Sequence, residues 1–356
     1  MNEQLKVIII GAGFAGSTLH LPAYQLNKKT KVCAVVDFNE DACKKICYDK
    51  KIEHWYKSYE EAVKIHQPDI VSISTPPKTH FPIVENLINK VPLIILEKPI
   101  FSNTEEAYKV MELAKQSHTT ILPVHNKLCS HGVEKSINYF KKGYLGDILQ
   151  FNAYWMNDGT KNHMTKDPNH WSHSLNGGRW EELIPHPLYI AYHFMGPLKI
   201  ENVAVQRSNN CLEHLNFDEI TVSLSAKKGF VNIRCSATPK INYNFFQVLG
   251  TKESLFFDTT NVIKKIHKAS RINNSHLINL KDKATKRLER MCTAVKNTLK
   301  KNPSSTTKNK HGAFLDKAIE NHLLNKDQIV SWEEAIGILE LTQNIGDELK
   351  KLSKTQ

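Results

Sequence analysis

Short apolar runs alternate with amphipathic stretches through the first third of the chain. Segments such as 58–66 and 103–116 place apolar residues at helical spacing and lie between runs that are typical of buried strands. The strand-like runs are 6–11, 31–37, 69–75, 91–97 and 119–126. Because a parallel crossover needs a long connection, this alternation predicts a parallel sheet with helices on both faces.

The second half of the chain has a different pattern. A helical stretch at 131–142 is followed by strand-like runs separated by turn residues, at 148–156, 200–207, 219–226, 229–237 and 245–250. Several neighbouring strands of this kind predict a mainly antiparallel sheet. Two later segments, 311–324 and 331–352, return to helical periodicity, and Ser331 with Glu334 predicts a capping box for the second.

Length and composition set limits on this picture. With 356 residues and 40% hydrophobic content, the chain can bury a substantial core, and two domains are expected. No apolar run approaches the roughly 20 residues that span a bilayer, and the N-terminus lacks signal-peptide features, so a cytoplasmic location is expected. The seven cysteines form no CxxC pair, which predicts neither a disulfide framework nor a thiolate zinc site.

The positive charge is concentrated in one segment. Residues 261–310 contain fourteen Lys and Arg residues against Asp282 and Glu289, a surplus that equals the net charge of +12. The remainder of the chain is neutral overall, so the charge does not indicate a nucleic-acid-binding fold.

From Leu280 onward this segment has the pattern of a basic amphipathic helix. Its apolar positions are Leu280, Ala284, Leu288, Met291, Cys292, Val295 and Leu299. The pattern fits an ordinary helix with a solvated basic face, peripheral contact with an anionic membrane surface, or contact with an oligomer partner.

A glycine motif follows the first strand-like run. In GAGFAG, Gly11 would allow a tight turn, Gly13 would admit a pyrophosphate close to the backbone, and Gly16 would let the next helix pack on the sheet. Asp37 ends the next strand, where a carboxylate accepts hydrogen bonds from a ribose 2′-hydroxyl and repels a 2′-phosphate. The combination predicts a dinucleotide site for NAD in preference to NADP. A glycine turn with a surface aspartate is the alternative.

Two further stretches lie at the predicted carboxyl edge of the sheet, where open α/β folds bind ligands. They are TPPKTH at 75–80 and EKP at 97–99, and GGRWEELIPHPLY follows at 177–189. Together with GAGFAG, these motifs resemble the Gfo/Idh/MocA family, the glucose-fructose oxidoreductase and inositol dehydrogenase-like enzymes, along nearly the whole chain.

The resemblance implies an α/β fold in two parts. Residues 1–125 would form an N-terminal Rossmann domain with a doubly wound parallel sheet. Residues 126–356 would form a C-terminal α+β domain on a large, mainly antiparallel open sheet, which often mediates homo-oligomerisation. The cofactor site would include Gly11, Ala12, Gly13, Phe14, Ala15, Gly16, Asp37, Thr75, Pro76, His80, Glu97 and Lys98.

The same resemblance implies a catalytic cluster of Lys98, Glu182 and His186. Glu182 stands where aspartate is usual, and Tyr189 replaces an acid that is common three residues after the histidine. Oxidation of an alcohol requires a base for the hydroxyl proton, and neutral imidazole suits that task. Because His186 precedes Pro187, it is expected at a helix N-cap, with Glu182 orienting its ring and Lys98 donating to the substrate oxygen.

Other polar residues are expected around the substrate. Asn126 would reach nicotinamide or substrate, and His311 would face the pocket. Trp171 and Arg179 would line a sugar pocket, with Arg179 also able to pair an anionic group. His163, His170 and His173 have no carboxylate or cysteine at a persuasive spacing, so no metal is expected.

Two classes of function fit these residues. The first is an NAD(P)-dependent oxidoreductase that transfers hydride to or from a carbinol of a sugar, polyol or nucleotide sugar. The second is a non-catalytic dinucleotide-binding protein of the same fold with a regulatory or scaffold role. The presence of Lys98 and His186 in their motifs favours the enzyme.

Overall fold

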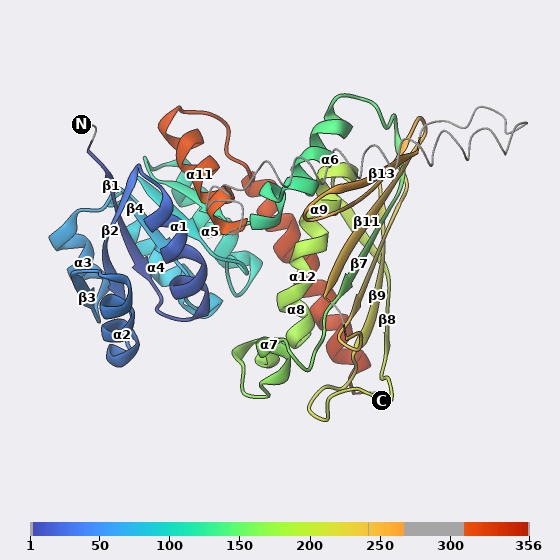
Figure 1. Cartoon of the computed structure of the whole chain (residues 1–356), viewed down its shortest axis with the longest axis horizontal. Coiled ribbons are helices and arrows are strands. Elements are labelled where there is room, and N and C mark those ends of the chain that lie inside the picture. Colours follow the sequence, from blue (N-terminus) through green and yellow to red (C-terminus); the bar gives the residue numbers. More distant parts are fainter. Residues whose placement is uncertain (1–2, 241, 267–309, 355–356) are drawn as a thin grey trace, which may run out of the picture.

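The computed structural model describes residues 3–240, 242–266 and 310–354, which build two sheets with helices packed on them (Figure 1). The first sheet is six-stranded, in the order β3-β2-β1-β4-β5-β6, and its paired strands are all parallel. Its strands are β1 (Leu5–Ile10), β2 (Thr30–Val36), β3 (His54–Tyr56), β4 (Ile70–Ile73), β5 (Leu93–Leu96) and β6 (Thr120–Pro123). This confirms the predicted doubly wound Rossmann sheet. The three-residue edge strand β3 was not predicted, because it is too short to show a period.

The central strands of this sheet are buried on both faces. Every residue of β4 and β5 is buried, as expected for parallel strands covered by helices on both sides. The covering helices are α1 (Leu21–Leu26), α2 (Glu40–Lys50), α3 (Tyr59–His66), α4 (His80–Leu87) and α5 (Thr104–Lys115). Asn39, Ser58 and Asn103 cap the starts of α2, α3 and α5 by accepting backbone N–H groups at 2.9 to 3.1 Å.

The second sheet is seven-stranded, in the order β13-β12-β11-β7-β10-β9-β8. Its strands are β7 (Ile148–Met156), β8 (Leu198–Gln206), β9 (Glu219–Ala226), β10 (Phe230–Ser236), β11 (Tyr243–Gly250), β12 (Ser254–Asp258) and β13 (Val262–Ile266). Only the pair β7 and β10 is parallel within this sheet, which confirms the mainly antiparallel prediction.

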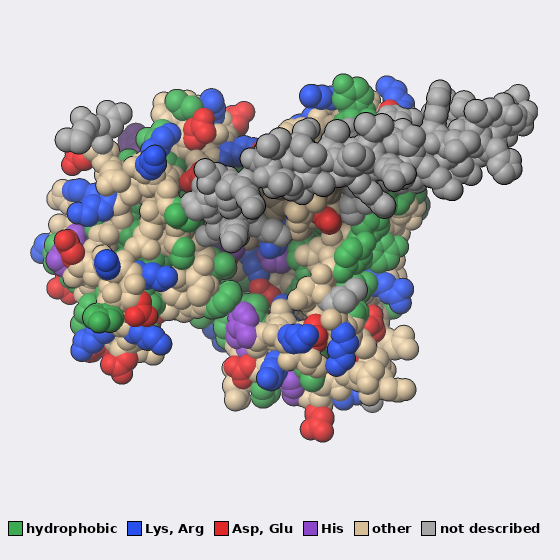
Figure 2. Space-filling view, viewed as in Figure 1, with side chains coloured by type: hydrophobic (Ala, Val, Ile, Leu, Met, Phe, Trp, Pro, Cys, Tyr) green, Lys and Arg blue, Asp and Glu red, His purple; other side chains and the backbone are tan. Residues whose placement is uncertain are grey.

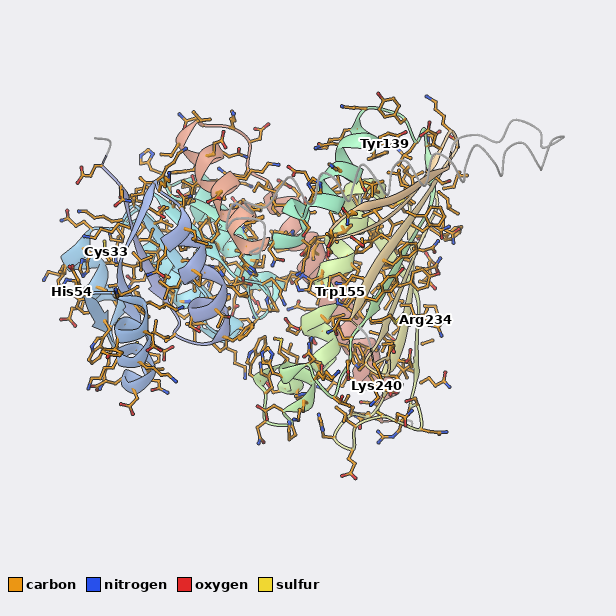
Figure 3. The ribbon with its side chains drawn as sticks, in the orientation of Figure 1. Cys33, His54, Tyr139, Trp155, Arg234 and Lys240 are labelled. Carbon is orange, nitrogen blue, oxygen red and sulfur yellow. The ribbon has the colours of Figure 1, made fainter. Side chains whose placement is uncertain are left out.

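One face of the second sheet packs against helices. Trp155 lies on the helix side and Arg234 on the opposite side (Figure 3), and only Trp155 is buried. The helical segments that follow residue 125 are η3 (Asn126–Cys129), α6 (His131–Lys141), α7 (His163–Lys166), η4 (Trp171–Ser174), α8 (Arg179–Leu183), α9 (Pro185–Met195), α11 (Lys310–Leu323) and α12 (Trp332–Leu352).

The last two helices connect both halves of the molecule. α11 packs on α1 and η3, and α12 packs on α5 as well as on α9 and β8. Ser331 caps α12 by accepting the Glu334 N–H at 3.1 Å. The reciprocal half of the predicted capping box is wrong, because the Glu334 carboxylate lies against His125 and His193, each at 3.2 Å.

The basic segment is only partly described. β13 covers 262–266, whereas the predicted basic helix from Leu280, with its proposed membrane contact, lies in 267–309 and therefore outside the described residues. Among the described helices, none has the length and apolar character needed to cross a membrane.

Candidate active site

The glycine loop follows β1 and is shaped by two of its three glycines. Gly11 has φ +108°, a left-handed conformation that favours glycine, and a Cβ on Gly16 would lie 1.9 Å from the Gly11 carbonyl oxygen. A Cβ on Gly13 would meet nothing within 4 Å. The protein's own packing therefore requires Gly11 and Gly16, and the space at Gly13 fits the approach of a pyrophosphate. The next helical turns, η1 (Ala15–His20), are π-helical.

Asp37 lies directly after β2 and faces this loop. Its Oδ2 accepts the Ala12 N–H at 2.7 Å, and its Oδ1 accepts the Asn39 N–H at 2.9 Å. The carboxylate is thus fixed beside the glycine loop by two backbone donors. This arrangement fits a dinucleotide whose ribose lies near Asp37 and whose phosphates lie near Gly13.

Phe14 is the residue of the loop that contacts the other half of the molecule. Its ring lies 4.5 Å from that of His163 at the start of α7. His163 in turn neighbours His170, whose ring lies 5.5 Å from that of Trp171. The segment that carries Trp171 therefore extends to the edge of the glycine loop.

Lys98 follows β5 and forms an ionic triad with the buried Glu182 and Arg179. The Lys98 ammonium donates to the Glu182 carbonyl oxygen at 3.0 Å and to its Oε1, while Arg179 donates to its Oε2. Burial alone would raise the pKa of Glu182, but the charges of Lys98 and Arg179 outweigh it and lower this pKa to about 2. Glu182 is therefore ionised, and the triad carries one net positive charge.

Two expected roles in this triad need correction. Glu182 was expected to orient His186, but its carboxylate oxygens are held by Lys98 and Arg179. Arg179 was expected to line a sugar pocket, but its side chain is 5% exposed and bonds Glu182 and Thr165. Arg179 and Glu182 lie three residues apart on α8 and therefore on the same face of that helix, which brings the guanidinium to the carboxylate.

His186 lies in the first turn of α9 and not at the expected N-cap, which is Ile184. Pro185 and Pro187 both fit this turn, because the first N–H groups of a helix have no partner within it. His186 Nδ1 lies 2.8 Å from the Tyr189 hydroxyl, and its ring stacks on Trp155 at 5.4 Å. Burial, together with the positive charges of Lys98 and Lys127, lowers the pKa of His186 well below its usual value. The neutral imidazole expected from the sequence thus results mainly from burial.

Glu97 is held by two histidines from distant parts of the chain. Its Oε1 lies 2.9 Å from His20 Nε2 and 3.0 Å from His311 Nε2, and its Oε2 accepts the Lys98 N–H at 2.9 Å. Burial would raise the pKa of Glu97, but the hydrogen bonds from both histidines hold it well below its usual value. This carboxylate, predicted to contact the cofactor, is engaged by the protein itself.

The trio of His20, Glu97 and His311 also has the composition of a metal site, and among the described residues it alone does. Two ligands of one zinc ion, each about 2.0 to 2.1 Å from the metal, lie about 3.3 Å apart in tetrahedral geometry. The observed 2.9 and 3.0 Å are the usual lengths of N–H···O hydrogen bonds. The trio is therefore interpreted as a hydrogen-bonded cluster.

The remaining predicted residues divide into two groups. Asn126 and His311 lie together, with the Asn126 amide nitrogen 3.0 Å from His311 Nδ1. His80 is fully buried, and its ring nitrogens lie 2.8 and 2.9 Å from the carbonyl oxygens of Thr75 and Ile100. His80 therefore holds the backbone of the loop after β4, and its ring does not face an open site.

Sequence reasoning missed Trp155, which stacks on His186, and His20, which contacts Glu97. Trp155 looked like an ordinary strand residue, and His20 lies beyond the glycine motif on its helix. The available signal for His20 was a histidine within an otherwise apolar helical stretch, four residues after Gly16. Figure 2 shows the hollow between the two halves of the molecule, with histidine and basic side chains visible in and beside it.

Fold and site together define a protein with an N-terminal Rossmann sheet and a second half in which helix α9, packed on β7, carries the facing His186. The chain belongs to the Gfo/Idh/MocA oxidoreductase family. Residues 5–125 match its NAD-binding Rossmann fold, and residues 140–347 match its C-terminal alpha/beta domain. The family resemblance and the NAD-binding fold predicted from the sequence are thereby confirmed.

Individual relatives are distant. Oxidoreductase P35 of Formosa agariphila is 22% identical over 217 residues, which cover 60% of this chain and 66% of that protein. The chain spans about half the length of the curated relatives that it matches.

Solved structures show the same fold over almost the whole chain. The apo scyllo-inositol dehydrogenase from Lactobacillus casei has a TM-score of 0.74 at 13% identity and covers 99% of this chain and 98% of its own. The WlbA dehydrogenase from Bordetella pertussis, in complex with NADH and UDP-GlcNAcA, has a TM-score of 0.73 at 12% identity, with 99% and 96% covered.

Proposed function

We propose that the protein is an NAD-dependent dehydrogenase acting on a CH–OH group of a sugar, polyol or nucleotide sugar. One observation carries the proposal: Lys98 follows β5 at the carboxyl edge of the Rossmann sheet, pairs with Glu182 and lies near His186, whose pKa is lowered mainly by burial. Lys98 is close enough to lower the pKa of His186. The names of the fold relatives, an inositol dehydrogenase and a dehydrogenase with a bound UDP-sugar, support the same substrate class.

His186 and Lys98 have different roles in the oxidation of the alcohol. His186 accepts the hydroxyl proton as the O–H bond breaks, and the substrate carbon becomes a carbonyl as its hydrogen leaves with two electrons. A bound nicotinamide supplies the acceptor for that hydride. Lys98 donates a hydrogen bond to the oxygen while negative charge develops on it, and Glu182 keeps Lys98 in place.

The test begins with the cofactor. Nucleotide released from the denatured protein is identified, and the protein is then mixed with NAD or NADP and a panel of sugars, polyols and nucleotide sugars. Absorbance of the reduced nicotinamide should rise with NAD and at least one member of the panel. Tight NAD binding without turnover across the panel would favour the regulatory or scaffold alternative, and no NAD binding would exclude both. Because Asp37 would repel a 2′-phosphate, equal affinity for NAD and NADP would remove its proposed role.

The glycine loop provides a separate prediction. Gly13→Ala should weaken NAD binding at least about tenfold, because its methyl group would occupy the space that fits the pyrophosphate. The free energy of unfolding should change by less than about 1 kcal/mol, since the added Cβ meets no protein atom within 4 Å. Calorimetric NAD titration and urea unfolding measure the two effects.

Gly16→Ala is the matched control for this loop. Its Cβ would lie 1.9 Å from the Gly11 carbonyl oxygen, so overpacking should destabilise the protein by about 1 to 3 kcal/mol. Unchanged NAD affinity in Gly13→Ala would place the pyrophosphate elsewhere.

We also propose that the outer face of the second sheet joins two copies of the chain. Half-exposed aromatic rings lie together across β7, β11 and β12, with Phe245 6.1 Å from Tyr154 and 5.9 Å from Phe256. Such a cluster of aromatic rings, on a face that none of the described helices covers, is typical of an interface. Light scattering should give at least a dimer, and Phe245→Glu should give a monomer. A monomeric parent protein would refute this.

A further inference from the structure

The hydroxyl of Tyr189 is the nearest hydrogen-bond partner of the proposed base. Tyr189 is fully buried, and its oxygen lies 2.8 Å from His186 Nδ1, 3.2 Å from the Lys127 backbone nitrogen and 3.3 Å from Asn126 Oδ1. A phenol has one proton and two acceptor sites. The Lys127 N–H donates to one of these sites. The Tyr189 hydroxyl therefore donates its one hydrogen bond either to Asn126 or to His186. Which of the two accepts it decides which nitrogen of His186 carries hydrogen.

The orientation of Asn126 settles the choice, and Glu97 sets that orientation. Glu97 accepts hydrogen from His311 Nε2, and burial lowers the pKa of His311, which favours the neutral ring. Neutral His311 with hydrogen on Nε2 has its lone pair on Nδ1. The Asn126 amide nitrogen lies nearer to that Nδ1 (3.0 Å) than to Nε2 (3.3 Å), so the amide donates to His311. Asn126 thereby presents its oxygen to Tyr189, and an amide oxygen only accepts.

We infer that Tyr189 and Asn126 are positioning residues that fix the tautomer of His186. The Tyr189 hydroxyl donates to Asn126, and His186 donates its Nδ1–H to the Tyr189 oxygen. His186 Nε2 is left with a free lone pair, which is the form a general base requires. The inference rests on the proposed dehydrogenase function, and it gives a positioning role to the tyrosine that stands where an acid is common in the family.

Stacked rings hold this arrangement from both sides. Trp155 stacks on His186 with an angle of 11° between the ring planes, and His125 stacks on Tyr189 at 4.3 Å and 14°. His125 is itself held by Glu334 at 3.2 Å. Neither His186 nor Tyr189 can rotate without losing a stacking partner. The stacking therefore keeps the donor and the acceptor of each hydrogen bond in place.

An uncharged hydrogen-bond partner such as Tyr189 also suits His186 as a general base. A carboxylate beside Nδ1 would favour imidazolium and raise the pKa of His186, whereas a phenol hydroxyl orients the ring without adding negative charge. Tyr189 therefore orients His186 while leaving it neutral over a wide range of pH.

Tyr189→Phe tests the inference, with Tyr192→Phe as the matched control on the same helix. Tyr189→Phe should lower kcat at least about tenfold with little change in the KM of the substrate, since a wrong tautomer impairs the proton step and not binding. Tyr192→Phe should retain kcat. Equal kcat in the parent and Tyr189→Phe would overturn the role of Tyr189.

A second measurement reads the tautomer without any turnover. In ¹⁵N NMR of the unmodified protein, the His186 ring should show hydrogen on Nδ1 and a free Nε2, and Tyr189→Phe should give a mixture of tautomers. Hydrogen on Nε2 in the parent protein would overturn the inference even if the variant is unstable. Because this readout needs no substrate, its failure is distinguishable from failure of the proposed dehydrogenase activity.

Discussion

His186→Ala and Lys98→Met are each expected to lower turnover at least about a hundredfold, the usual scale of acid and base assistance. His186→Ala removes the group that accepts the hydroxyl proton, and Lys98→Met removes the donor to the oxygen that gains negative charge. Neither side chain is needed to hold the dinucleotide at Gly13 or Asp37, so NAD affinity should change far less. Steady-state kinetics and calorimetric NAD titration separate the two effects.

Lys64→Met, on the exposed face of α3, is the control for Lys98→Met and should leave kcat unchanged.

The dependence of kcat/KM on pH gives a further check on His186. A base must be unprotonated, and burial lowers the pKa of His186, so kcat/KM should stay constant as the pH falls through 6.5 and decline only below it. Full activity in His186→Ala would remove that residue from the mechanism.

Glu182→Gln is expected to destabilise the protein by about 3 to 5 kcal/mol, because it leaves the buried Arg179 and the largely buried Lys98 beside a neutral amide. The effect should depend on pH. The pKa of Glu182 is lowered to about 2, so its stabilising contribution is present above the unfolded pKa of about 4.5 and is lost as the pH falls towards 2. Urea unfolding at pH 7 and at pH 3 should therefore show a smaller difference between parent and variant at the lower pH.

Glu181→Gln is the matched control at the adjacent position. Glu181 is also buried, but burial raises its pKa, and its Oε2 accepts a hydrogen bond from the Gly177 N–H at 2.7 Å. An amide oxygen can replace that acceptor, so this variant should lower the free energy of unfolding much less than Glu182→Gln does. Equal losses in the two variants would mean that the ionic triad contributes nothing specific.

Local sequence patterns were sufficient to predict the first sheet, apart from β3, and its glycine loop. Buried parallel strands are continuous apolar runs, and the glycine spacing reflects a turn whose conformation is set within six residues, so both are visible in the sequence. β3 was missed because three residues at a sheet edge carry no periodic signal. His186 was placed two positions too early in its helix, since the rule for residues before proline does not foresee two prolines within one first turn.

The sequence by itself determined the fold class and the position of the glycine loop, and it predicted Asp37, Lys98 and His186 as site residues. The strands and the glycine turn depend on neighbours within a few residues, and the predicted site residues were identified from their short motifs. Only the tertiary structure decided which polar groups pair. Glu97 meets His20 and His311 across separations of 77 and 214 residues, and Lys98 meets Glu182 across a separation of 84 residues. Buried polar groups must find partners wherever the packed elements bring donors and acceptors together, and that proximity in space is not encoded in spacing along the chain.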